Sequence, residues 1–207
     1  MEDSDKNCYD IKMILLGELG TGKTNLISAY INESYNENSY STLQPTQSYK
    51  IVLINDIKLK VCLWDTCGQE EYRSITKNFI KGSHIVIFVY DITRKETFLE
   101  LNYWVNSALE ELGNKESIFG VAANKTDLFE KSEVEDKEGR EYARSIGALF
   151  HKTSGKEDPN GFKDYVDKLI ENLLVSRNII QKGESFSHES FSLQKTKKKS
   201  KHKSCCS

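Results

Sequence analysis

The sequence predicts an α/β protein with a six-stranded, mostly parallel sheet, one antiparallel edge strand and about five flanking helices. Apolar runs that end in glycine or polar residues alternate along the chain with stretches of helical periodicity. The run at residues 84–91 is almost wholly apolar, which is typical of a strand buried on both faces. Only Asn55 and Asp56 separate the alternating runs at 49–54 and 57–65, which favours a hairpin and therefore one antiparallel pair.

Each expected element has its own signal. The expected strands share an apolar interior and a glycine or polar end, and they cover residues 10–17, 49–54, 57–65, 84–91, 117–124 and 148–154. The clearest helices are expected over residues 23–31, 97–112 and 136–147, and from Pro159 onward. Gly147 favours the end of a helix, while Asp158 and Pro159 favour the start of the last one. Phe162, Val166, Leu169, Ile170 and Leu173 supply its apolar face.

Composition sets the limits of the domain organisation. The 207 residues are 38% hydrophobic and 29% charged, which is typical of one globular domain with a real core. No apolar run approaches the ~20 residues that cross a bilayer, and the polar, acidic N-terminus is unlike a signal peptide. Five cysteines without metal-ligand spacing favour reduced thiols. We expect a short extension at 1–7, the domain at 8–175 and a disordered tail at 176–207.

The charge of −2 is distributed unevenly. From Ser176 onward eight lysine and arginine residues stand against two glutamates, so the tail carries +6 and the rest of the chain −8. An acidic body of this kind disfavours nucleic acid as a partner. The basic tail favours contact with a negatively charged membrane surface, and a nuclear-localisation signal is the weaker interpretation.

The stretch "GELGTGKT" at residues 17–24 follows a predicted strand and opens a predicted helix. This is the sequence and context of a P-loop, in which backbone N–H groups and a helix N-terminus bind nucleotide phosphates. Lys23 would reach the β- and γ-phosphates, and the Thr24 hydroxyl would ligate Mg²⁺. A short tight turn is the alternative when the pattern is taken alone.

Two further motifs end predicted strands. In "WDTCGQE", Asp65 would hold Mg²⁺ through water, the Gly68 N–H would meet a γ-phosphate and Gln69 would orient an attacking water. In "NKTD", residues 124–127, the Asp127 carboxylate accepts from two guanine donors and would lie unpaired against adenine. Asn124 would support the loop and the base, and the stem of Lys125 would cover a ring face.

These motifs resemble those of small GTPases of the Ras superfamily, over residues 8–175. The segments "FVYDITRKETFLELNYWV", "FIKGSH" and "KVCLWDTCGQEEYRSI" are similar to the Rab branch. The resemblance implies a P-loop NTPase fold of the Ras-like G-domain type. It also implies a GTP/GDP switch that hydrolyses GTP slowly without an activating protein and recruits effectors in vesicle trafficking.

The resemblance assigns site residues position by position. It implies that the nucleotide is bound by Gly17, Leu19, Gly20, Thr21, Gly22, Lys23, Thr24, Asn25, Tyr35, Thr42, Asp65, Gly68, Asn124, Lys125, Asp127, Ser154, Gly155 and Lys156. Thr24, Thr42 and Asp65 would hold Mg²⁺, and Gln69, Lys23, Thr42 and Gly68 would take part in catalysis. Thr42 lies eighteen residues after Thr24, as the family requires, which favours it over Thr46. Tyr35 would pack on the guanine, and the Gly155 N–H of "TSGK" would meet its O6.

The C-terminus resembles Rab-like ends with two adjacent cysteines. Cys205 and Cys206 lie outside the usual C-a-a-X pattern, because Ser204 is fourth from the end. The resemblance implies two geranylgeranyl groups, which anchor a protein more stably than one. The resemblance also implies a monomer on the cytoplasmic face of an endomembrane that cycles with the cytosol. The implied partners are an escort or GDI-type chaperone, an exchange factor and an activating protein. A solvated lysine-rich tail with spare thiols is the alternative.

Three departures from the family pattern leave alternatives open. Leu19 replaces a residue that is often small, and its bulk is expected to crowd Gln69 and slow hydrolysis. "LQPTQ" after Thr42 differs from the usual Rab effector-facing segment, and Cys67 stands where alanine is usual. A largely GTP-loaded, slowly hydrolysing membrane adaptor is therefore a second hypothesis. A P-loop kinase or ATPase is a third, which Asp127 disfavours.

Overall fold

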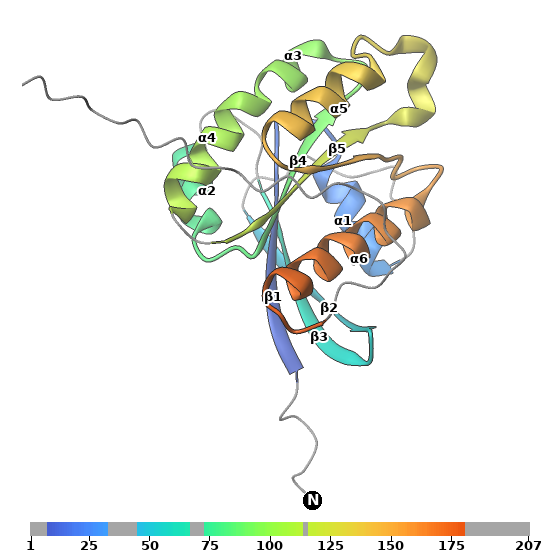
Figure 1. Ribbon diagram of the computed structural model, residues 1–207. Coiled ribbons are helices and arrows are strands. Elements are labelled where there is room, and N and C mark those ends of the chain that lie inside the picture. The colour runs from blue at the N-terminus through green and yellow to red at the C-terminus, as the bar shows by residue number, and fades with distance from the viewer. Residues whose placement is uncertain (1–7, 33–44, 67–72, 114–115, 181–207) are drawn as a thin grey trace, which may run out of the picture.

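The computed structural model describes residues 8–32, 45–66, 73–113 and 116–180, and these contain a single six-stranded sheet. Its strands are β1 (Cys8–Leu16), β2 (Thr46–Ile54), β3 (Ile57–Asp65), β4 (Ile85–Asp91), β5 (Ile118–Asn124) and β6 (Leu149–Lys152). They lie in the order β2-β3-β1-β4-β5-β6, and only β2 and β3 pair antiparallel (Figure 1). The predicted fold class is therefore confirmed.

The helices are α1 (Lys23–Asn32), α2 (Arg73–Ile80), α3 (Lys95–Leu99), α4 (Leu101–Leu112), α5 (Asp136–Ser145) and α6 (Pro159–Ser176), with a 3₁₀ helix η2 (Thr126–Lys131). The prediction of one helix over residues 97–112 is wrong, because α3 and α4 meet at Glu100. The interruption is confined to Glu100, which keeps right-handed helical angles (φ −70°, ψ −9°) and whose N–H still donates to the Glu96 carbonyl at 3.0 Å. None of the helices in the described ranges is long and apolar enough to cross a bilayer.

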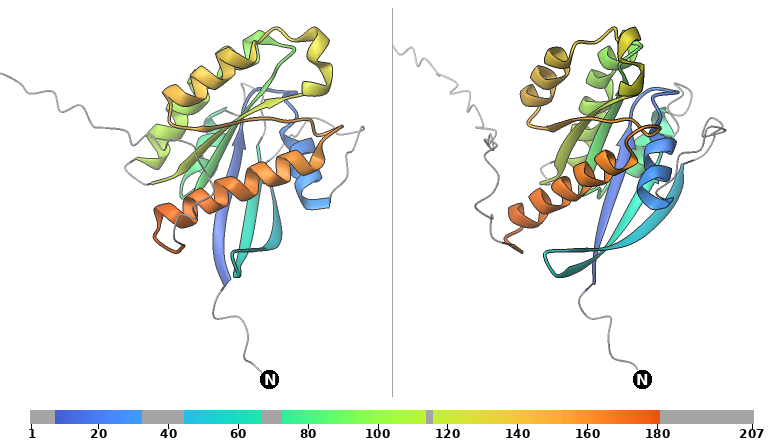
Figure 2. Two further views of the ribbon diagram at one scale, coloured as in Figure 1. Left: turned by 45° about the vertical axis from the view of Figure 1, so that its right-hand side comes forward. Right: turned by 90° about the vertical axis from the view of Figure 1, so that its right-hand side faces the viewer.

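The core consists of two apolar clusters, one on each face of the sheet. Helices α1 and α6 cover one face, and α4 and α5 cover the other (Figures 1 and 2). Successive residues of a strand point to opposite faces. In β4, Ile87 packs in the cluster that includes α1 and α6, while Phe88 packs in the cluster that includes α4 and α5. All seven residues of β4 are buried, as the apolar run at 84–91 predicts.

The local signals at the element ends are also confirmed. Asn55 and Asp56 have φ of 49° and 61°, the paired positive values that a type I′ hairpin turn requires. Gly147 has a φ of 68° just beyond α5. The Asp158 side chain accepts a hydrogen bond of 2.8 Å from the Gly161 N–H and caps α6, which begins at Pro159.

Gly120 of β5 allows α6 to approach the sheet closely. A Cβ at this position would overlap the Tyr165 hydroxyl and lie 3.1 Å from Leu169 Cδ1. The same Tyr165 hydroxyl donates a hydrogen bond of 2.8 Å to the Leu149 carbonyl of β6. Tyr165 therefore links α6 to two neighbouring strands, and the contact depends on the missing side chain at Gly120.

We predict that Gly120→Ala lowers the free energy of unfolding by about 1–3 kcal/mol, because the methyl group overpacks the site. Tyr165→Phe alone should cost about 1 kcal/mol through the lost hydrogen bond. In the double variant the phenylalanine has no hydroxyl for the new methyl group to overlap. The double variant should therefore lose less free energy of unfolding than the two single variants lose together. Urea unfolding of the four proteins measures this coupling. Strictly additive costs would contradict the close contact.

Candidate functional site

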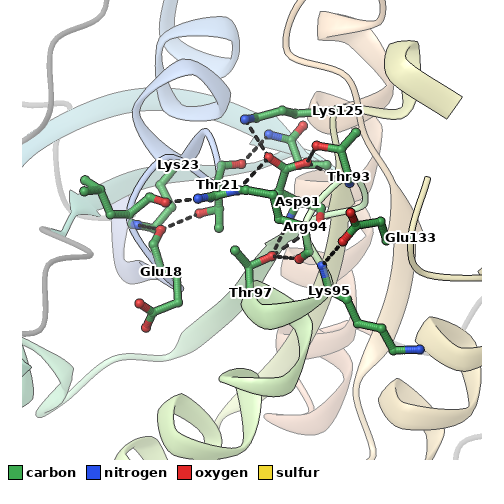
Figure 3. A network of polar contacts seen from close by, with 12 residues as sticks. Glu18, Thr21, Lys23, Asp91, Thr93, Arg94, Lys95, Thr97, Lys125 and Glu133 are labelled. Carbon is green, nitrogen blue, oxygen red and sulfur yellow. Dashed lines mark hydrogen bonds and ion pairs between the residues drawn. The ribbon is translucent and has the colours of Figure 1, made fainter. Parts of the chain in front are cut away.

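The predicted motifs gather at the carboxyl edge of the parallel strands. The loop after β1 leads into α1, β3 ends at Asp65, β4 at Asp91 and β5 at Asn124. Parallel strands that share a sheet place these ends side by side. Figure 3 shows side chains from the loop after β1, from the end of β4 and from the loop after β5 pointing toward one another.

The loop at residues 17–24 closes around its own lysine. Lys23 is 5% exposed, and its Nζ donates hydrogen bonds of 2.8 Å to the Gly17 carbonyl and 3.0 Å to the Glu18 carbonyl. Gly17 and Gly22 have positive φ, and a Cβ on either would overlap a neighbour: the Val89 carbonyl oxygen for Gly17 and Asn124 Nδ2 for Gly22. At these two positions of the predicted P-loop, the positive φ and the lack of room for a Cβ both require glycine.

A second layer of side chains holds this loop from outside. The Thr21 side chain is buried and donates to the Glu18 carbonyl at 2.9 Å. The Glu18 carboxylate accepts from the Trp104 indole of α4 at 3.0 Å. Leu19 is 39% exposed, so the bulk that departs from the family pattern lies at the surface of the loop.

The two predicted magnesium-binding residues within the described ranges are in direct contact. The Thr24 hydroxyl donates to Asp65 Oδ2 at 2.7 Å, and the Asp65 side chain is buried at the end of β3. Because the Thr24 hydroxyl is the donor in this hydrogen bond, the lone pairs of its oxygen stay available to a cation. A hydroxyl and a carboxylate are the hard oxygen donors that Mg²⁺ prefers, so these residues fit the ion.

No group of three or more histidine, cysteine, aspartate or glutamate side chains in the described part of the chain is arranged to hold a metal. A cation at Thr24 and Asp65 would therefore need further oxygen ligands. Mg²⁺ in nucleotide sites is commonly held by one or two protein groups together with phosphate oxygens. The small donor set is consistent with that kind of site.

The Asn124 side chain connects three of the motifs. Its Nδ2 donates to the Thr21 carbonyl of the P-loop at 2.8 Å, and its Oδ1 accepts from the Thr153 hydroxyl at 3.1 Å. Both contacts are buried. Thr153 begins the "TSGK" segment, and its carbonyl accepts from the Thr126 N–H at 3.2 Å. Asn124 thus joins its own loop to both neighbouring loops, while its predicted contact with a base stays a prediction.

The predicted guanine-recognition residues also lie together. Asp127 Oδ1 accepts from the Ser154 hydroxyl at 2.6 Å, which fixes the orientation of the carboxylate. Gly155 is buried against Asn25 of α1, since a Cβ on Gly155 would lie 3.6 Å from Asn25 Cβ. Lys156 is exposed beside them.

Asp91 at the end of β4 is a buried charge with several partners. It is 1% exposed, and its Oδ2 lies 2.7 Å from Lys125 Nζ, while its Oδ1 accepts from the Thr93 N–H and hydroxyl. Burial alone would raise the pKa of this carboxyl, but the bonds from Lys125 and Thr93 outweigh it and hold the pKa below its ordinary value. Asp91 is therefore ionised at neutral pH.

Asp91, Arg94 and Trp104 belong to the site although none of the predicted site motifs contains them. Arg94 Nη2 donates to the Leu19 carbonyl at 2.7 Å, and its Nε lies 3.3 Å from Asp91 Oδ2 (Figure 3). The available signal was a charged residue at the end of a wholly apolar strand, followed closely by a basic one. That signal indicates a partner for Asp91 but not which loop Arg94 reaches.

Several predicted residues lie outside the described ranges. These are Tyr35, Thr42, Gly68, Gln69, Cys205 and Cys206, whose assignments stay predictions. Thr46, the rejected alternative to Thr42, is the first residue of β2 and pairs with Asp65 in the hairpin register.

Comparison with known proteins assigns the family. The family model described as the Ras family matches residues 12–175. Ras-related protein RABA6b of Arabidopsis thaliana is 35% identical over 160 residues, which cover 77% of this chain and 69% of the relative. Human Ras-related proteins Rab-22A and Rab-31 are 35% and 34% identical over 151 residues, which cover 73% of this chain and 77% of each relative.

The family model covers well over half of the chain, and its limits span the P-loop, "WDTCGQE", "NKTD" and "TSGK". The match therefore extends over the P-loop, Asp65, "NKTD" and "TSGK", which the described residues place at one edge of the sheet. It disfavours a P-loop kinase or an ATPase. The chain belongs to the Rab branch of the Ras superfamily of small GTPases.

Proposed function

We propose that residues 8–175 form a GTPase domain that binds guanine nucleotide across the P-loop and the "NKTD" and "TSGK" loops, and hydrolyses GTP to GDP. One observation carries this proposal: the Asn124 amide joins the P-loop carbonyl of Thr21 to Thr153, next to the Asp127–Ser154 pair. The phosphate-binding and base-binding parts are thereby held in one rigid arrangement. Preorganisation of this kind favours tight nucleotide binding.

In this proposal Asp127 selects the base. Its carboxylate accepts from the N1–H and 2-amino group of guanine, while Ser154 holds it in place. Adenine offers an acceptor at N1 and no 2-amino group, so it would leave the carboxylate unpaired. The Gly155 N–H would meet O6, Asn25 would support the "TSGK" loop, and Lys125, held by Asp91, would cover the ring.

The P-loop and the N-terminus of α1 would bind the phosphates. Lys23 lies at the start of α1, where the helix dipole adds positive potential. Its ammonium group is already fixed by two loop carbonyls and would stabilise charge on the β- and γ-phosphates without reorganisation. Thr24 and Asp65 would hold Mg²⁺, which when bound supplies charge neutralisation at the phosphate oxygens.

Hydrolysis would be attack of water on the γ-phosphate. We propose that Gln69 orients this water and that Thr42 and the Gly68 N–H contact the γ-phosphate, as the family pattern implies. Loss of that phosphate would release the segments around Thr42 and residues 68–72, which makes the protein a switch. The match to the Ras family favours this cycle over the adaptor that stays loaded with GTP.

The proposed output is recruitment of effectors to a membrane in vesicle trafficking. Geranylgeranyl groups on Cys205 and Cys206, aided by six lysines between 195 and 203, would anchor a monomer to the cytoplasmic face of an endomembrane. An exchange factor, an activating protein and an escort or GDI-type chaperone would control the cycle. The mass of the C-terminal peptide from native protein tests the anchor.

We predict that Leu19→Gly raises the single-turnover rate of GTP hydrolysis by about tenfold, because the smaller residue frees space beside the γ-phosphate for Gln69 and water. GDP affinity should change little, since Leu19 contributes to the P-loop through its backbone. Phosphate release from preloaded protein measures the rate. An unchanged rate would show that the leucine does not crowd the reaction.

We predict that Asp127→Asn weakens GDP binding about a hundredfold and strengthens binding of xanthosine diphosphate. Ser154 would still donate to Oδ1 of the new amide, which would direct the NH₂ group toward the base. An NH₂ group repels the guanine 2-amino group but donates to the xanthine 2-carbonyl. Competition against a fluorescent guanine nucleotide measures both affinities, with Asp158→Asn as the matched control on the α6 cap. Equal loss of both nucleotides would refute base recognition by Asp127.

A further inference from the structure

We propose that Arg94 is a positioning residue that aims the Gly20 N–H at the β-phosphate by holding the Leu19 carbonyl away from it. This inference rests on the proposed nucleotide site and adds a residue that sequence motifs do not assign. Arg94 would not touch the nucleotide. It would act through one peptide group of the P-loop.

In a trans peptide group, the direction of the carbonyl fixes the direction of the N–H. The C=O of one residue and the N–H of the next point in opposite directions across the peptide plane. Arg94 Nη2 binds the Leu19 carbonyl at 2.7 Å, so the Gly20 N–H must point away from Arg94. A Cβ on Gly20 would lie 3.4 Å from the same Nη2, which places the guanidinium directly against this peptide. If the peptide flipped, a carbonyl oxygen would face the phosphates.

Arg94 can hold the Leu19 carbonyl in place only if it is itself fixed, and contacts of its backbone and its side chain fix it. Its backbone carbonyl accepts from the Thr97 hydroxyl at 2.8 Å, and its N–H donates to the Asp91 carbonyl at 3.1 Å. Its Nε lies 3.3 Å from the Asp91 carboxylate (Figure 3). The guanidinium therefore bridges two fixed acceptors with two different nitrogens, a geometry that a lysine cannot reproduce.

Asp91 connects Arg94 to the base-binding loop. The carboxylate is 1% exposed, and the same Oδ2 that faces Arg94 also accepts from Lys125 Nζ at 2.7 Å. Two cations share one carboxylate, so the cluster keeps a net positive charge beside the phosphate-binding loop. The low pKa of Asp91 keeps this arrangement intact at neutral pH. Through Arg94 and Asp91, the end of β4 therefore helps to fix the position of the Leu19–Gly20 peptide, which does not depend on the loop alone.

The test separates the phosphate contact from general support of the fold. Arg94→Gln should weaken GDP binding about tenfold, yet leave GMP binding within twofold, because GMP lacks the β-phosphate that the Gly20 N–H would meet. Arg94→Lys should lie between wild type and Arg94→Gln, since it keeps the charge and one contact. Competition against a fluorescent GDP analogue measures each dissociation constant for the full-length chain.

Arg177→Gln is the matched control. Arg177 lies with Ser83 and Ser117 at the amino-terminal ends of β4 and β5, at the opposite edge of the sheet. The control should change neither affinity. GDP binding that is unchanged in Arg94→Gln would overturn the proposal, and so would equal weakening of GDP and GMP, which indicates a purely structural role. If wild-type protein binds GDP no more tightly than GMP, the proposed phosphate site itself fails.

Discussion

A loop that binds phosphates must keep its own carbonyl oxygens away from them. In this protein, side chains occupy the carbonyls of the P-loop: Lys23 those of Gly17 and Glu18, Arg94 that of Leu19, and Asn124 that of Thr21. Each of these carbonyls is thereby held toward its side-chain partner, and the N–H group of the same peptide points away from that partner. The arrangement of the peptide groups in the loop therefore depends in part on Arg94 and Asn124, which follow or end other strands of the sheet.

The sheet explains why these distant residues can serve one loop. Asn124 ends β5, Arg94 follows β4 and Lys23 opens the helix after β1, and these three strands are parallel neighbours in the order β1-β4-β5. Their carboxyl ends are thus adjacent whatever their separation in sequence. The two apolar clusters on the faces of the sheet fix the strands, and through them the polar groups at this edge.

Much of this arrangement could be predicted from sequence, because each motif has a local cause. Alternation of apolar runs predicts the sheet, and Asn55–Asp56 predicts the hairpin that makes one edge antiparallel. The role of Arg94 could not be predicted, since its partner Leu19 is 75 residues away in sequence and only tertiary packing brings them together. The division between α3 and α4 could not be predicted either, because the apolar period of the sequence continues through Glu100 and the backbone there keeps helical angles.

The most direct test of the account is mass spectrometry of the nucleotide carried by protein isolated from its own cells in the presence of Mg²⁺. The interlocked loops predict GDP or GTP bound close to one per chain, because a preorganised site with this base selectivity should retain its ligand during purification. Recovery of adenine nucleotide at similar occupancy would contradict base selection by Asp127. A chain that stays empty after incubation with GDP and Mg²⁺ would contradict the whole arrangement.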